Sequence, residues 1–150
     1  MADKITREMR SLNMSAIKNR DTKPELWFRK QLFTRGYRYR KNTGTIVGHP
    51  DIWLAKYRTA VFVHGCYWHR HKGCKYAYIP KSNLDFWNAK FQKNIERDES
   101  VKEKLRSQGI RVIIVWECSI KTAMKSAEKT ESLLNRFCEL IMSDELFVEL

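Results

Sequence analysis

The sequence has no apolar run long enough to cross a bilayer, and its N-terminus, Met1 to Arg7, lacks the apolar segment of a signal peptide. Both absences predict a cytoplasmic protein without a membrane partner. Internal repeats, low-complexity segments and linkers are also absent, so the 150 residues are expected to form one domain. Residues 1–21 are polar, with little hydrophobic periodicity, and are interpreted as a flexible N-terminal arm of that domain.

Acidic residues are few compared with basic ones. The chain has 17 Asp and Glu against 29 Lys and Arg, which gives a net charge of +12. Such an excess indicates either an anionic partner or simply a solvated basic surface. We favour a nucleic-acid partner, because a strongly basic pI, here 9.7, is typical of proteins that bind phosphates.

The four cysteines are not expected to form disulfides in a cytoplasmic protein, so they are buried thiols or metal ligands. Cys66, His71 and Cys74 have the spacing C-x4-H-x2-C, and Cys118 directly follows an apolar run. Thiolates and an imidazole suit a structural zinc ion with four protein ligands. Spacing alone also permits ordinary buried cysteines. Cys138 lies among apolar residues and is expected in the core.

Hydrophobic periodicity predicts an α/β fold with a central mixed β-sheet flanked by helices. A helix is expected from the capping sequence at residues 22–25 to Gly36, and further helices over 84–108 and 124–142. Strands are expected at 37–40, 50–54, 60–63 and 110–116, with 50–54 and 60–63 forming a hairpin. Residues 64–83 are irregular, and a loop of this length is usually functional or held by a ligand.

Asp51 follows Pro50 at the start of one hairpin strand, and the other strand ends at Val63. One class of nucleases builds its magnesium site in this way, since Mg²⁺ prefers hard oxygen ligands. The usual Glu-x-Lys of that class is missing, because Val63 is followed by His64 and Gly65. A Pro-Asp pair is also common in turns, so both interpretations stay open.

Asp98 shares a helix face with an apolar stripe formed by Trp87, Phe91, Ile95, Val101 and Leu105. A carboxylate on an inward face needs a partner, and a histidine or a basic side chain is the natural one. The alternative is a partly exposed acid at the edge of the stripe.

The remaining candidates lie in the predicted loop and at the first helix. Loop histidines His64 and His69 are candidates for proton transfer, because the histidine pKa lies near neutral. Glu25 caps a helix and is also available to orient a histidine. Tyr67 and Trp68 are either a core pair or exposed rings that stack on bases.

Several segments, taken in order, resemble the very-short-patch repair (Vsr) mismatch endonucleases over about residues 13–118. They are Asn13-Met14, Arg20-Asp21-Thr22, Pro50-Asp51, Phe62 to His69, Asn94 to Asp98, and Val115 to Cys118. The resemblance implies a restriction-endonuclease-like fold with a degenerate catalytic motif and a structural zinc. It also implies Mg²⁺-dependent nicking of one DNA strand next to a T·G mismatch, in the repair of deaminated 5-methylcytosine.

The resemblance further implies a role for each site residue. Asp51 and the main-chain carbonyl of Val63 would hold magnesium, His69 would be the acid/base group with Glu25 nearby, and His64 would pair with Asp98. Zinc would be bound by Cys66, His71, Cys74 and Cys118. Tyr67 and Trp68 would wedge into the duplex, with Met14 entering from the arm.

Two features depart from the family pattern: Val63 replaces a frequent threonine, and the segment from His71 to Cys74 is one residue longer. We expect a monomer with a functional link to a cytosine methyltransferase and other repair proteins. The alternatives are a zinc-stabilised DNA-binding module without catalysis, and a restriction-type nuclease for matched sites.

Overall fold

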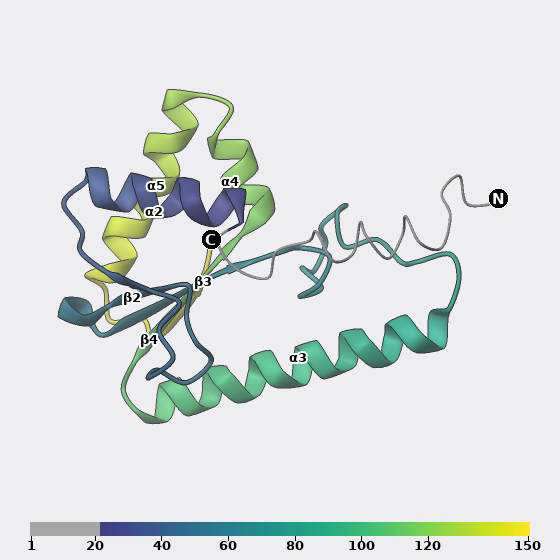
Figure 1. The fold of residues 1–150 in the computed structure, drawn as a ribbon. Coiled ribbons are helices and arrows are strands. Elements are labelled where there is room, and N and C mark those ends of the chain that lie inside the picture. The colour runs from purple at the N-terminus through teal and green to yellow at the C-terminus, as the bar shows by residue number, and fades with distance from the viewer. Residues whose placement is uncertain (1–21) are drawn as a thin grey trace.

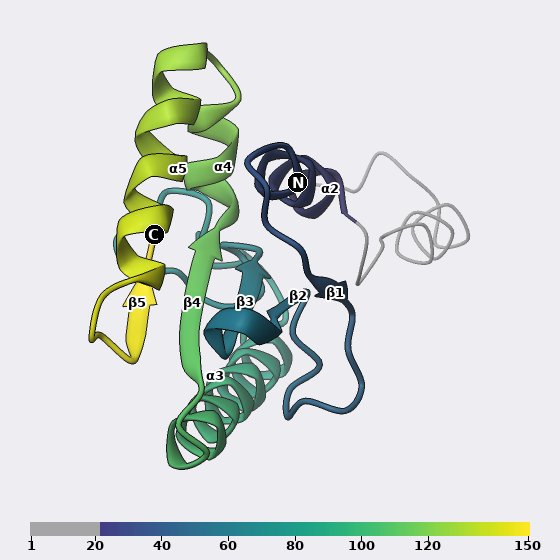
Figure 2. The ribbon, with the colours of Figure 1, turned by 90° about the vertical axis from the view of Figure 1, so that its left-hand side faces the viewer.

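The computed structural model describes residues 22–150, which contain a five-stranded mixed sheet in the order β1-β2-β3-β4-β5 (Figures 1 and 2). The strands are β1 (Arg40–Lys41), β2 (Ile52–Leu54), β3 (Thr59–His64), β4 (Arg111–Trp116) and β5 (Phe147–Glu149). β1, β2 and β3 are antiparallel neighbours, whereas β3, β4 and β5 run parallel. The mixed sheet and the β2–β3 hairpin are therefore confirmed. Met14 lies outside the described residues.

Helices cover both faces of the sheet, with α2 (Lys23–Thr34), α4 (Glu117–Ala123) and α5 (Ala127–Ile141) on one face and α3 (Leu84–Ser107) on the other (Figure 1). Alternate residues of β3 and β4 point to opposite faces. Val61, Ile113 and Val115 join the core under α2, α4 and α5, and Phe62 and Ile114 join the core under α3. Two covered faces explain why both strands are continuous apolar runs.

The helix start at residues 22–25 is confirmed. Thr22 is the N-cap of α2, and its Oγ1 accepts a hydrogen bond from the Glu25 backbone N–H at 3.4 Å. Pro24 occupies the first turn of α2. Backbone N–H groups in this turn have no acceptor within the helix, so the lack of an N–H in proline costs no hydrogen bond there. Phe28 and Leu32 of this helix are fully buried in the core.

α3 extends beyond the edge of the sheet beside residues 65–83, so that its C-terminal half carries most of the packing against the sheet (Figure 1). Leu105 is fully buried, and Phe91 packs against the loop. The expected stripe is wrong at Ile95, which is 38% exposed, because the helix turns this position away from the loop. Asn94 faces the loop instead and donates a hydrogen bond to the Trp68 carbonyl.

One further expectation was wrong. Residues 37–39 are not a strand, because Tyr37 and Tyr39 pack against the core and the Tyr39 hydroxyl donates to the Arg29 carbonyl at 3.2 Å. The helix expected at 124–142 is confirmed as α5, and the separate helix α4 before it was not predicted. Ser126 starts α5 by accepting a hydrogen bond from the Lys129 N–H at 3.1 Å.

β5 was not predicted, since Phe147–Glu149 is too short for a pattern and becomes a strand only by pairing with β4. Among the helices of residues 22–150, none is both long enough and apolar enough to cross a membrane.

Candidate functional site

The four predicted zinc ligands meet at the C-terminal end of β3 and β4. The ligand atoms of Cys66, His71, Cys74 and Cys118 all lie within 4.8 Å of one another. β3 and β4 are parallel neighbours with His64 opposite Trp116, so Cys66 and Cys118, each two residues further on, emerge side by side. The loop then folds back, and the Cys118 Sγ lies 3.5 Å from the His71 Nδ1. Residues 47 positions apart in the sequence thus form one cluster.

The chemistry of this Cys3His cluster fits a zinc ion. Burial lowers the pKa of His71, which favours the neutral imidazole that a metal requires. Burial also raises the pKa of the Cys66 thiol to about 12, so a bound cation is needed to stabilise its thiolate. The His71 ring stacks on Trp116 with centroids 4.1 Å apart, which fixes its orientation. The cluster is consistent with a structural zinc site.

Asp51 lies at the same end of the sheet. Its Oδ2 accepts a hydrogen bond from the Val63 backbone N–H at 2.7 Å. The antiparallel hairpin causes this contact, because Ile52 pairs with Val61 and the residue before Ile52 therefore lies beside the end of β3. The carboxylate and the Val63 backbone together offer hard oxygen donors of the kind Mg²⁺ prefers.

A second polar cluster unites His64, His69 and Asp98, whose potential ligand atoms also lie within 4.8 Å of one another. The His69 Nδ1 is 2.7 Å from the Asp98 Oδ2, and the two side chains are 24% and 26% exposed. The His64 and His69 rings stack with centroids 3.8 Å apart and planes at 6°. Asp98 is therefore paired with a histidine, as its position on α3 predicted.

The expected pairing of Asp98 with His64 was wrong, since the hydrogen bond goes to His69. His64 is only 8% exposed and is enclosed by the rings of Phe62, His69 and Trp116. This burial, followed by the neighbouring charge of His69, lowers the pKa of His64 to about 3. A neutral imidazole does not need a carboxylate partner, whereas His69 lies in the loop facing α3 and meets Asp98 there.

Tyr67 and Trp68 belong to an aromatic cluster between the loop and α3. Its other members are Tyr78, Phe86, Trp87 and Phe91. Tyr67 and Trp68 are both half-buried, and Phe86 and Tyr78 are 61% and 63% exposed. Sequence reasoning assigned Trp87 and Phe91 to a core stripe and did not connect them with Tyr67, because only the fold brings α3 over the loop.

Glu25 is almost fully buried in α2, with 3% of its surface exposed. Its predicted position near His69 stays a prediction, as does the magnesium role of the Val63 carbonyl.

Comparison with known proteins resolves the class of this site. The family model for the DNA mismatch endonuclease Vsr matches residues 2–75. A type II nicking enzyme of Neisseria meningitidis, V.NmeAIP, is 45% identical, with 94% of this chain and all of the relative covered. The DNA mismatch endonuclease Vsr of Escherichia coli is 37% identical, with 96% and 90% covered.

The chain belongs to the Vsr DNA mismatch endonuclease family. It is a DNA nicking endonuclease, and DNA is its substrate. The type II nicking enzyme V.HpaIIP of Haemophilus parainfluenzae is a further relative, 41% identical over 85% of this chain and 89% of its own length. The alternative of a DNA-binding module without catalysis is therefore set aside.

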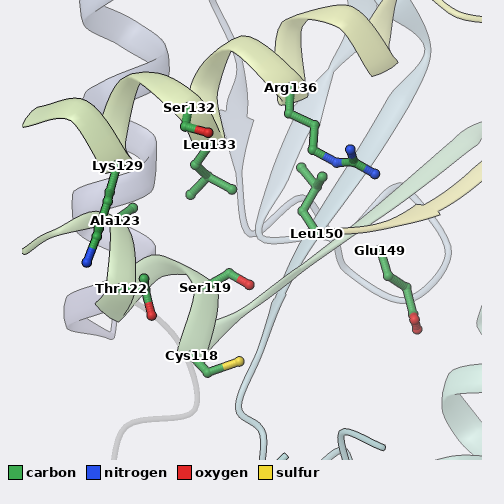
Figure 3. A pocket seen from close by; sticks show the side chains of 10 residues that line it. All are labelled: Cys118, Ser119, Thr122, Ala123, Lys129, Ser132, Leu133, Arg136, Glu149 and Leu150. Carbon is green, nitrogen blue, oxygen red and sulfur yellow. The ribbon is translucent and has the colours of Figure 1, made fainter.

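This Vsr-family chain also has a pocket of about 490 Å³ between α4, α5 and the end of β5 (Figure 3). Lys129 and Arg136 lie at the pocket, with Cys118 at its lower edge in Figure 3. The lining includes neither His69 nor Asp51, so the pocket is separate from the proposed catalytic residues.

Proposed function

We propose that this enzyme nicks one strand of duplex DNA next to a T·G mismatch, in the repair of deaminated 5-methylcytosine. The name of the Escherichia coli relative, a DNA mismatch endonuclease, supports a mismatch as the target. The net charge of +12 supports tight contact with phosphates. Mispaired bases stack less well than a matched pair, so inserting side chains beside them costs less free energy.

The observation that carries the proposal is the His69–Asp98 hydrogen bond at the end of the sheet where Asp51 contacts Val63. A carboxylate bonded to one imidazole nitrogen fixes the tautomer and orients the ring. With Nδ1 directed at Asp98, the Nε2 of His69 is the atom that transfers a proton to or from the reacting groups. His64 supports the ring from behind through the stacking contact.

Asp51 and the Val63 carbonyl are the residues that would hold magnesium. The chemistry supplied there by Mg²⁺ would be polarisation of the scissile phosphate and activation of a water molecule. A carbonyl ligand survives the replacement of threonine by Val63, since the backbone is unchanged. Glu25 is proposed to lie on the His69 side of the site and to assist its orientation.

Zinc is proposed to be structural, bound by Cys66, His71, Cys74 and Cys118, because four protein ligands leave no open position for a substrate. The ion would hold the loop that carries both His69 and the aromatic residues. Tyr67 and Trp68 are proposed to wedge into the duplex from this loop, and Met14 from residues 1–21. We further propose a cytoplasmic monomer linked to a cytosine methyltransferase.

The proposal is tested by incubating the enzyme and magnesium with a T·G duplex and its matched T·A control. Preferential nicking of the T·G duplex is expected. Equal cutting of both would instead favour a restriction-type nuclease for matched sites. In the same assay Asp51→Ala is expected to keep its DNA affinity and lose nicking, and parallel loss of both would contradict the magnesium role.

A further inference from the structure

The hairpin of this enzyme lacks the lysine of the Glu-x-Lys motif, because Val63 is followed by His64 and Gly65. Cleavage of a phosphodiester places additional negative charge on the phosphate oxygens, and a preorganised cation stabilises that charge. Arg97 is a cation one residue before Asp98, the carboxylate that binds His69.

Arg97 is positioned by the same helix surface that holds the loop. Asn94, Arg97 and Asp98 are three and four residues apart on α3, so their side chains are neighbours. The Asp98 carboxylate bonds His69 at 2.7 Å, and the Asn94 Nδ2 donates to the Trp68 carbonyl at 3.0 Å. The Arg97 Nη2 donates to the Asn94 Oδ1 at 3.1 Å. Asn94 therefore holds the Arg97 guanidinium close to the part of the loop that contains Trp68 and His69.

Arg97 also keeps most of its hydrogen-bonding capacity. Its side chain is exposed, and the ion pairs found among residues 22–150 do not include it. Arg70 and Arg111 differ, because their guanidinium groups donate to backbone carbonyls within the fold. A guanidinium has five N–H donors and can bind a phosphate through two at once, so Arg97 retains donors for a ligand.

We propose that Arg97 donates hydrogen bonds to a non-bridging oxygen of the scissile phosphate and supplies the cation that the missing lysine would provide. This inference rests on the proposed function in one respect, namely that the cleaved phosphodiester lies at His69. It adds a substrate-contacting residue, held by Asn94, to the residues already assigned. Arg97 follows Asn94, which meets Trp68, and precedes Asp98, which meets His69, so a strand opened at the wedge would pass it on the way to the histidine.

The first test measures single-turnover nicking with saturating enzyme and magnesium. Arg97→Gln is expected to reduce the rate constant about 100-fold, the effect of removing one transition-state donor, while Arg97→Lys recovers part of it. Arg106→Gln is the matched control, since Arg106 is an exposed arginine of the same helix beside Lys102 and Phe147. This control should stay within about twofold of wild type. A wild-type rate for Arg97→Gln would overturn the proposal.

The second test is a binding cycle without magnesium, on whichever duplex the wild type cuts. The phosphate at the mapped nick is replaced by a neutral methylphosphonate. The replacement should weaken wild-type binding several-fold and Arg97→Gln binding hardly at all, because the contact is already lost. Additive losses would overturn the proposal. If the enzyme shows no preference for T·G duplexes, only the proposed function is contradicted. The Arg97 proposal can still be tested, because the binding cycle requires only that the position of the nick is known.

Discussion

The apolar core of the sheet and the loop at its C-terminal end are held in place in different ways. Under α2, α4 and α5 the contacts are those of a conventional apolar core, in which Phe28, Phe137 and Leu134 are fully buried. The face under α3 also has an apolar core, but beyond the end of the sheet residues 65–83 contain no helix or strand. They are fixed by the Cys3His cluster, by Asn94 and by Asp98.

This difference separates stability from chemistry. Apolar burial is roughly proportional to area and tolerates small shifts, whereas a metal ligand or a directed hydrogen bond places one atom accurately. The loop that carries His69 depends on a few such contacts, so single substitutions there, other than at the zinc ligands, should affect nicking more than folding. Substitutions in the apolar core under α2, α4 and α5 should lower stability more than the nicking rate.

The largest expected effect follows removal of a zinc ligand. The wild type is expected to bind one zinc ion per chain. Cys74→Ser should lose this zinc and should also lose nicking activity. Structural zinc can contribute on the order of 10 kcal/mol to a small site, so the variant should also unfold more readily. Metal analysis, thermal unfolding and nicking assays check this. Cys138→Ser, on α5 and outside the cluster, is the control and should keep its zinc. A wild type without zinc would refute the site.

Removing a core ring tests the apolar core. Phe137 is fully buried and makes an edge-to-face contact with Phe28 at 5.3 Å. Phe137→Ala should lower the free energy of unfolding by about 3–5 kcal/mol, measured by urea denaturation. Below the unfolding transition, the nicking rate per folded molecule should stay close to wild type. A strong loss of rate in the folded variant would show that the core and the loop are coupled.

Asp98→Asn should separate orientation from stability. Both partners of the His69–Asp98 pair are partly exposed, so the free energy of unfolding should change by less than about 1 kcal/mol. Loss of the carboxylate should reduce the single-turnover nicking rate by roughly 100-fold, because His69 loses its oriented tautomer. Glu96→Gln, an exposed carboxylate of the same helix, is the control and should nick normally. Similar rates for both variants would contradict the role of Asp98.

The smallest expected effect concerns the start of α2. Thr22→Ala removes the Oγ1 that accepts from Glu25 N–H and should lower the free energy of unfolding by about 1 kcal/mol. Thr22→Ser keeps a hydroxyl acceptor and should restore most of the difference. Urea denaturation of the three proteins checks the order, and equal stabilities would show that the cap contributes nothing.

Much of the fold could be predicted from local patterns. The capped start of α2, the long amphipathic helix α3 and the apolar strands β3 and β4 are each encoded within about a dozen neighbouring residues. α4 was not predicted, because its 7 residues are too few to show a helical period. β5 could not be found in this way, because three residues carry no pattern and pairing with β4 alone makes them a strand.

Residue types and their order along the chain were enough to indicate the family, a Cys3His cluster that suits zinc and an inward carboxylate at Asp98. They could not indicate which histidine Asp98 binds, because that depends on how α3 crosses the loop. The same crossing joins Tyr67 to Trp87 and links Arg97 to the loop through Asn94. Contacts between segments far apart in the chain have no local signature, and in this enzyme they are the contacts that orient the proposed catalytic groups.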